Sequence, residues 1–379
     1  MSSTTRSISW ITRRGAWALA GTLLAASGAI AGGQPFLPSI AVTSTVPANG
    51  DQNPYGVAIV PPGFPSGGPL SPGDVLVSNF NNSNNLQGTG TTIVNYHPNG
   101  NVEPPGQASV FFQGTGTGLT TALGVLQRGF VLVGNVPTTD GTINTIQPGG
   151  LLFLDRHGNQ VAPSPYTNML DGPWDLTIFD GFNFAKVFVS NVLNGTVTRL
   201  DLAVGPSSIT VTSANVIASG YTVIPNSAAL ILGPTGLAYN PETDVLYVAS
   251  TQDNAIYAVP HAGSRNASSG TGARIFQNEH LRGPLALGFA PNGDLLTANG
   301  DAVNADPNQP SEIVEFTPNG RFVSQSNVDA SQGGAFGFAI GQGANGTLEF
   351  AAIDDVTGSL TVNSLPRSGG DSQSLASGQ

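Results

Sequence analysis

The chain has 379 residues and no cysteine, and its charged residues, 9% of the total, give a formal net charge of −11. Nucleic acid and anionic membranes are therefore poor partners, because both require a cationic surface, and no disulfide framework can form. The 50 glycines, 28 prolines and 39% hydrophobic residues suit an all-β protein, in which many short strands need tight reversals.

The first 31 residues are predicted to form a signal peptide of bacterial type. Arg13 and Arg14 precede the apolar run "GAWALAGTLLAASGAIA", which ends in the small-x-small sequence Ala29–Ala31. Cleavage after Ala31 would leave no stable membrane span, and a retained anchor is the alternative. General secretory and twin-arginine export are both compatible with the arginine pair. We expect a periplasmic or secreted protein, whose net charge becomes −14 because cleavage removes three arginines and no acid.

Six copies of a three-strand unit follow. The second strands read "DVLVSN", "FVLVGN", "KVFVSN", "VLYVAS", "DLLTAN" and "TLEFAA". The first strands place a small residue at one repeated position, with spacings of 68, 51, 61, 50 and 51, at Gly56, Gly124, Asp175, Gly236, Ala286 and Gly337. This period, with room for a fourth strand, predicts a six-bladed β-propeller of four-stranded blades. Small residues are expected where the innermost strands converge.

The predicted propeller occupies residues 32–366. The last unit has little chain left for a fourth strand, so we expect the N-terminal strand Ser39–Val46 to complete the last blade and remove two open sheet edges. Residues 367–379 are predicted to be a flexible tail. The segment "GPTGLAYNPETDVLYVASTQDNAIYAVPHAG" from Gly233 resembles an NHL repeat, and this resemblance implies the propeller fold while leaving the function open.

Asparagine recurs where the second strands end, at Asn79, Asn135, Asn191 and Asn299. These residues either form part of a ligand-binding ring, together with long Asn- and Asp-rich loops on the same face, or cap the turn between second and third strands. Amides suit glycans, and carboxylate and carbonyl oxygens suit calcium. The best local calcium candidate is the segment that carries Asp301, Asn304 and Asp306, although it lacks the spacing of an EF-hand loop.

The repeats are also similar to the gluconolactonase and regucalcin family, whose members are six-bladed propellers with a metal at the channel mouth. The resemblance implies metal ligands near the starts of the innermost strands, which here hold Tyr55, Leu123, Trp174, Thr235, Leu285 and Phe336. None of these is a carboxylate or a carboxamide, so the family's ligand pattern is absent. Asp171 and Asp175 flank Trp174 and could belong to a relocated site.

Tyr55, Trp174 and Phe336 form either an aromatic rim that stacks on a ligand or buried core at the channel mouth. Asp175 is the one carboxylate among the six small-residue positions, so it needs a partner, and it is our first catalytic or binding candidate. His280 lies near Glu279 and Arg282 and is a second acid–base candidate, unless this cluster is a solvated turn.

We expect a monomeric binding module for a protein, glycan or small-molecule ligand, which would use the Asn- and Asp-rich loop face. Calcium is the one cofactor that the residue types suggest. The alternative is an enzyme, a hydrolase or lyase of the lactonase or esterase kind that acts at the channel mouth.

Overall fold

The computed structural model describes residues 39–98, 100–161, 169–227, 229–300, 312–328, 334–343 and 346–365. All of them belong to the compact unit Leu37–Gln379, which is distinct from Met1–Phe36. The predicted signal peptide and tail lie outside the described residues, so both remain predictions. Within the described ranges, no helix has the length and apolar character that crossing a membrane would require.

The described residues form six four-stranded antiparallel sheets, each with its strands in chain order from the inside outward except the last. Blade one contains β2 (Gln52–Ile59), β3 (Val75–Asn81), β4 (Thr92–Tyr96) and β5 (Val110–Gln113). Blade two contains β6 (Leu119–Leu126), β7 (Phe130–Asn135), β8 (Gly150–Asp155) and β9 (Gln160–Val161). Blade three contains β10 (Pro173–Asp180), β11 (Phe184–Asn191), β12 (Thr196–Val204) and β13 (Ile209–Ser219).

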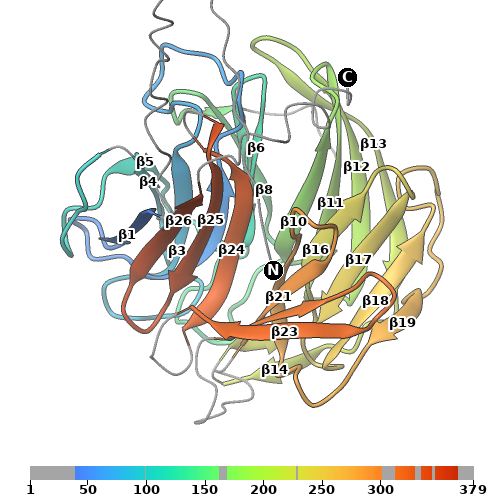
Figure 1. Ribbon diagram of the computed structural model, residues 1–379. Helices are drawn as coiled ribbons and strands as arrows, with labels where there is room; N and C mark the ends of the chain where they lie inside the picture. Colours follow the sequence, from blue (N-terminus) through green and yellow to red (C-terminus); the bar gives the residue numbers. More distant parts are fainter. Residues whose placement is uncertain are drawn as a thin grey trace, which may run out of the picture. The chain divides into compact units, whose positions relative to one another are not determined.

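The remaining blades repeat this order. Blade four contains β16 (Pro234–Asn240), β17 (Val245–Ser250), β18 (Ala255–Pro260) and β19 (Ala273–Phe276). Blade five contains β20 (Pro284–Phe289), β21 (Leu295–Asn299), β22 (Glu312–Phe316) and β23 (Phe322–Asn327). Blade six contains β24 (Ala335–Gln342), β25 (Leu348–Asp354), β26 (Ser359–Leu365) and β1 (Ser39–Ser44). The predicted all-β propeller of six four-stranded blades is confirmed (Figure 1).

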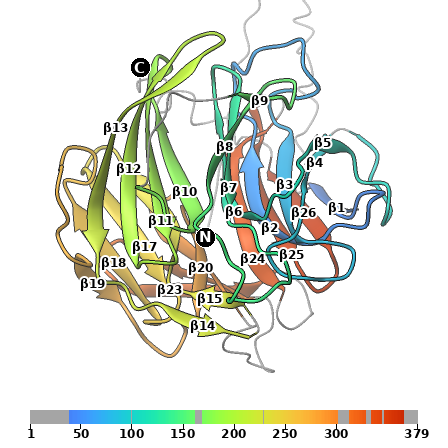
Figure 2. The ribbon, with the colours of Figure 1, turned by 180° about the vertical axis from the view of Figure 1, so that it is seen from behind.

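The two ends of the described chain meet in one sheet. β1 pairs antiparallel with β26, from Ser39 opposite Ser364 to Ser44 opposite Ser359, and the blue and red strands lie side by side in Figure 1. A separate two-stranded hairpin, β14 (Ile224–Asn226) and β15 (Leu230–Leu232), connects blades three and four. Figure 2 shows this hairpin beyond one end of the central strands.

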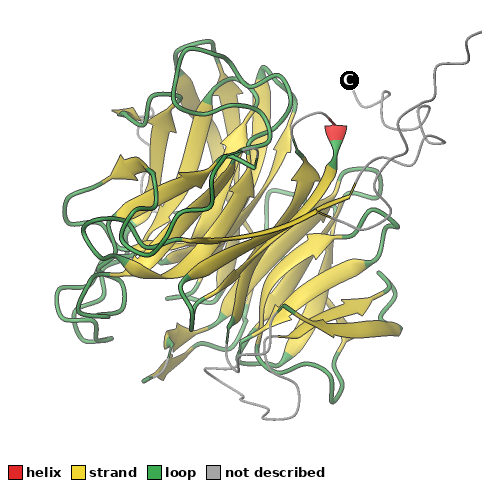
Figure 3. Cartoon of the chain, turned by 60° about the vertical axis from the view of Figure 1, so that its left-hand side comes forward, coloured by secondary structure: helices red, strands yellow, loops and turns green. Residues whose placement is uncertain are grey.

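Strands supply nearly all the regular structure (Figure 3). The second strand of each blade is an apolar run that is buried on both faces, as in β3, where all seven residues are buried. Such a strand lies between its two neighbouring blades, so both of its faces must be apolar. Leu132 of blade two and Val187 of blade three, for example, belong to one buried cluster. The core is therefore a series of layers between adjacent blades.

All six first strands contain an irregularity at the same place. The pairing between first and second strand shifts after Pro54, Leu119, Pro173, Pro234, Pro284 and Ala335. Regular pairing resumes at Val57, Leu123, Asp175, Leu237, Leu287 and Phe338. Bulges of this kind redirect side chains, and here they turn the residues at the start of each first strand toward the propeller axis.

This register corrects the alignment of two units. Ala122, not Gly124, is the equivalent of Gly56, and Thr121, not Leu123, is the equivalent of Tyr55. The repeat alignment places the first strand of unit two out of register by two residues, because its sequence "TALGVLQ" contains a glycine close to the equivalent position. In blade six, Asp354 takes the place of Asn79, since it pairs with Ala335 as Asn79 pairs with Pro54.

Candidate functional site

The channel between the first strands has two unlike ends. We call the face where each first strand begins and each second strand ends the asparagine face, and the other the opposite face. Along β24 the first four residues are buried and the last four are half-buried, and β10 becomes more accessible in the same direction. The channel is therefore closed toward the asparagine face and more open toward the opposite face.

An aromatic cluster closes the asparagine end. Tyr55 stacks on Phe80 with ring centroids 4.5 Å apart, and it lies 4.7 Å from Phe336 and 6.2 Å from Trp174. All four side chains are at most 3% exposed. Leu230 of the β14–β15 hairpin belongs to the same buried cluster. These rings are thus buried core rather than an open rim.

The positions that hold metal ligands in the resembling family do not suit a metal here. With Thr121 in place of Leu123, the six residues are Tyr55, Thr121, Trp174, Thr235, Leu285 and Phe336, and each is buried. None supplies a carboxylate or an amide oxygen, which calcium prefers. Among the described residues, no three His, Cys, Asp or Glu side chains come together as a metal site. Asp301, Asn304 and Asp306 lie outside the described residues.

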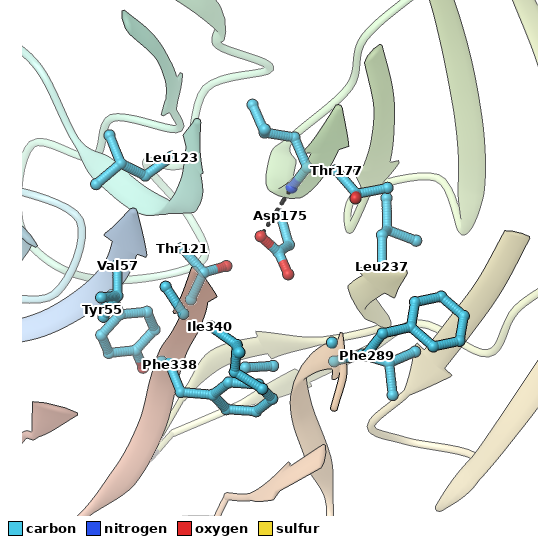
Figure 4. Close-up of a pocket in the computed structure, with 16 residues that line it drawn as sticks. Tyr55, Val57, Thr121, Leu123, Asp175, Thr177, Leu237, Phe289, Phe338 and Ile340 are labelled. Atoms are coloured by element: carbon cyan, nitrogen blue, oxygen red, sulfur yellow. Dashed lines mark hydrogen bonds between the residues drawn. The ribbon is translucent and has the colours of Figure 1, made fainter. Parts of the chain in front are cut away.

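Beyond the aromatic cluster the channel contains a cavity of about 190 Å³. All six first strands contribute to its wall, which is formed largely by aliphatic and aromatic side chains such as Val57, Leu123, Leu237, Phe289 and Phe338. Figure 4 shows Asp175 among them, with its carboxyl group directed into the cavity. Thr121 and Thr177 add two hydroxyl groups, of which that of Thr121 donates to the backbone oxygen of Trp174.

Asp175 lies at the junction between blades three and four. One carboxyl oxygen accepts the N–H of Leu176 at 2.8 Å, and the N–H of Leu237 in β16 is close enough to favour the ionised carboxyl. Its own N–H donates to Ser190 Oγ at 3.0 Å. The residue is half-buried and lines the cavity. Burial of its carboxyl group raises the pKa of Asp175 well above its ordinary value, while the two backbone N–H groups oppose that rise.

This burial predicts a pH dependence of stability that Asp175→Asn should remove. The raised pKa means that the folded chain holds the proton where the unfolded chain has lost it, so the free energy of unfolding falls as pH increases above about 4, until the folded carboxyl ionises. The variant cannot ionise, so it should gain stability relative to the parent as pH rises. Denaturant unfolding across this pH range measures the effect, with Glu242→Gln on an exposed turn as the control; parallel profiles for parent and Asp175→Asn would contradict it.

The recurrent asparagines, three buried and Asn135 half-buried, bind the chain that enters their blades. Three side-chain Oδ1 atoms accept an N–H one or two residues before a first strand: Asn135 from Gly118 at 2.8 Å, Asn191 from Asp171 at 3.1 Å and Asn299 from Arg282 at 2.8 Å. The expected capping of the turn between second and third strands explains only part of this pattern, since the principal contact lies on the incoming segment.

Asn79 makes the corresponding contact through its amide nitrogen. Nδ2 donates to the backbone oxygen of Thr45 at 2.9 Å and to Thr92 Oγ1 at 3.2 Å. Asn79, Asn191 and Asn299 are fully buried. Together with Asn135 they join the loops to the blades, and none of them lines the channel cavity.

The Asn-rich loop after β3 is folded on itself. Asn81 Nδ2 donates to Asn85 Oδ1 at 2.6 Å, and Asn82 Oδ1 accepts the N–H groups of Asn84 and Leu86 at 2.9 and 3.3 Å. Such bonds are typical of Asx turns. A second hollow, of about 340 Å³, lies between this loop region and the β14–β15 hairpin and is lined by Gln87, Gly141, Thr142, Ile143, Pro225, Asn226, Ser227 and Leu230.

Asp171 and His280 lie away from the cavity wall. Asp171 is half-buried in the segment that enters β10, where its backbone N–H donates a hydrogen bond to Asn191 Oδ1. The ring of His280 stacks on Phe322 with centroids 3.8 Å apart, and its Nδ1 lies 3.0 Å from Gln325 Oε1. The structure therefore brings neither residue to the cavity that Asp175 faces.

Sequence reasoning missed the apolar part of the site. Phe289, Phe338 and Ile340 line the cavity. The sequence does not identify them as site residues, because alternating apolar residues in a strand usually indicate core. A usable signal was the position of these residues in the second half of the first strands, which in a propeller borders the channel.

No protein-family model matches the chain, and no curated protein sequence matches it. Solved structures do. A gluconolactonase from Xanthomonas campestris has a TM-score of 0.51 at 14% identity, covering 86% of this chain and 90% of its own. A calcium-binding regucalcin from Agrobacterium tumefaciens has a TM-score of 0.51 at 12% identity, and the match covers 86% of this chain and 96% of the regucalcin. A luciferin-regenerating enzyme has a TM-score of 0.50 at 11% identity, and the match covers 87% of this chain and 96% of the enzyme. At these identities the likeness shows the six-bladed propeller fold alone.

Proposed function

We propose that this protein binds a small, mainly apolar molecule in the propeller channel, with Asp175 as the polar anchor. The observation that carries this proposal is a lone carboxyl group directed into a cavity of about 190 Å³ whose other lining side chains are mostly aliphatic or aromatic. Ligand sites are typically concave and apolar, with a few placed polar groups that fix orientation. A dry cavity of roughly 150 Å³ accepts benzene, so the volume suits a single ring or a branched alkyl group.

The asparagine face is a weaker candidate for this function. The side chains of Asn79, Asn135, Asn191 and Asn299 are engaged with the incoming segments, and the loop after β3 uses its amides internally. A glycan or protein partner at that face would have to compete with these bonds. Asp175, by contrast, presents its carboxyl group to open space.

Filling the cavity should abolish binding of a small neutral compound. Benzyl alcohol is a suitable probe because its ring matches the volume of the cavity. We expect Thr177→Phe, which adds a ring inside the cavity wall, to weaken its binding by at least about tenfold, and Thr177→Leu to weaken it less. Calorimetric titration measures the affinity, with Thr212→Phe on the exposed outer strand β13 as the control from the same blade.

Equal affinities in Thr177→Phe and Thr212→Phe would show that the compound binds elsewhere. No detectable binding to the parent chain would remove the support for a channel site. Unfolding curves for each variant would establish that the propeller remains folded.

A second candidate function, hydrolysis of a lactone or ester, is favoured by the raised pKa of Asp175 in an enclosed site, a property common among general acids. Water would add to the acyl carbon, the acyl C–O bond would break, and Asp175 would protonate the leaving oxygen and regain a proton from the water. The gluconolactonase likeness agrees with this chemistry at the level of fold only. A panel of lactones and esters tests it: turnover should be lost in Asp175→Asn and retained in His280→Ala, and turnover that survives Asp175→Asn would exclude it.

A further inference from the structure

The carboxyl group of Asp175 has no cationic partner within the cavity. The residues that line the cavity include no lysine, arginine or histidine. Asp201, by contrast, lies 3.1 Å from Lys186 and 3.1 Å from Arg199. A buried carboxylate ordinarily needs such a partner. At Asp175 the chain supplies the N–H of Leu176, with that of Leu237 nearby, and the residues that line the cavity supply no cation.

Aromatic rings complete a set of groups that suits a cation. Phe289 from β20 and Phe338 from β24 line the same cavity as Asp175. The face of an aromatic ring attracts an ammonium group, and the attraction increases when water is excluded. An anionic ligand would meet no basic group among the lining residues and would be repelled by an ionised Asp175. The net charge of −11 favours the approach of cations as well.

From this juxtaposition we infer that the ligand is a small amine with one apolar substituent. The ammonium group bonds to the carboxylate of Asp175, and the hydrocarbon part occupies the wall formed by Leu237, Phe289 and Phe338. The volume of about 190 Å³ leaves room for one ring or a short branched chain. This inference rests on the channel being the binding site, as proposed above.

Amine binding is coupled to the ionisation of Asp175. Asp175 and Tyr55 are the titratable side chains that line the cavity, and burial raises the pKa of Tyr55, so that its hydroxyl stays neutral. Burial also raises the pKa of Asp175. A bound ammonium stabilises the carboxylate, so Asp175 releases a proton when the amine binds at a pH below its raised pKa. The affinity for an amine should therefore rise with pH until Asp175 is ionised in the free protein.

The test compares benzylamine with benzyl alcohol, which has the same ring but no charge, by calorimetry on the full chain. We expect benzylamine to bind at least about tenfold more tightly, with proton release that appears as a dependence of the heat on the buffer. Asp175→Asn should remove both the preference and the proton release while benzyl alcohol still binds. Glu242→Gln removes one negative charge from an exposed turn and should leave both unchanged.

The outcomes separate the two proposals. Benzyl alcohol that binds as tightly as benzylamine, or an amine preference that survives Asp175→Asn, overturns the amine inference and leaves the channel site standing. A parent chain that binds neither compound overturns the channel site itself. Asp175→Ala serves as a second variant if Asp175→Asn does not fold.

Discussion

Replacement of Trp174 by alanine is expected to lower the free energy of unfolding by about 3–5 kcal/mol, the usual cost of removing a buried aromatic side chain. The ring is 2% exposed and makes edge contacts with Phe80 at 5.5 Å and Tyr55 at 6.2 Å between ring centroids. No neighbouring side chain can fill the space without leaving its own contacts, so a cavity would remain at the asparagine end of the channel.

Denaturant unfolding of Trp174→Ala and Phe184→Ala measures this effect. Phe184 begins the next strand of the same blade and is 46% exposed, so its loss should cost about 1 kcal/mol or less. Equal losses in the two variants would contradict the buried cluster. A Trp174→Ala variant of unchanged stability that fails to bind ligand would restore the alternative interpretation, in which this ring belongs to an open binding rim.

The repeat pattern was sufficient to predict the fold because a propeller blade is locally encoded. Each unit needs tight turns at Gly or Pro and a second strand that is apolar on both faces, and these requirements recur near every 50 residues. The bulge in each first strand is not encoded so clearly. The position of the bulge is determined by pairing with the second strand. The repeat pattern alone therefore assigns Gly124, instead of Ala122, to the small-residue position of unit two.

The candidate site was predicted in part. Asp175 stood out as a carboxylate among small residues, and the structure places it at a cavity. Which end of the channel is closed could not be derived from the repeats, because the closure combines side chains such as Tyr55, Trp174 and Phe336 with Leu230 from a hairpin outside the repeat. The role of the asparagines could not be predicted for a similar reason: their hydrogen-bond partners lie in the segments that enter the blades, and not only in the turns that follow the asparagines.

Replacement of Gly337 by alanine should destabilise the propeller by about 3 kcal/mol. A Cβ atom at this position would lie 1.9 Å from the backbone oxygen of Tyr55 in the adjacent blade, and backbone cannot yield as a flexible side chain can. Gly236 is similarly placed, with its Cβ 2.1 Å from the backbone oxygen of Leu285. These distances support the expectation that small residues mark the convergence of the first strands.

Gly341, four residues further along β24, provides the matched control. Its added Cβ would meet side-chain atoms of Ile59 at 3.2–3.5 Å, which can shift, and alanine would also restrict the unfolded chain. Gly341→Ala should therefore change the free energy of unfolding by about 1 kcal/mol at most. Similar unfolding midpoints for Gly337→Ala and Gly341→Ala would contradict close contact between blades six and one.

The same geometry explains why a carboxyl group can occupy this position in blade three. Asp175 is the equivalent of Gly337 and Gly236, where even a methyl group would meet the backbone of the next blade. Asp175 instead extends toward blade four, where the N–H of Leu237 lies near its carboxyl group. The carboxyl group enters the cavity that we propose as the binding site, and all six first strands line that cavity.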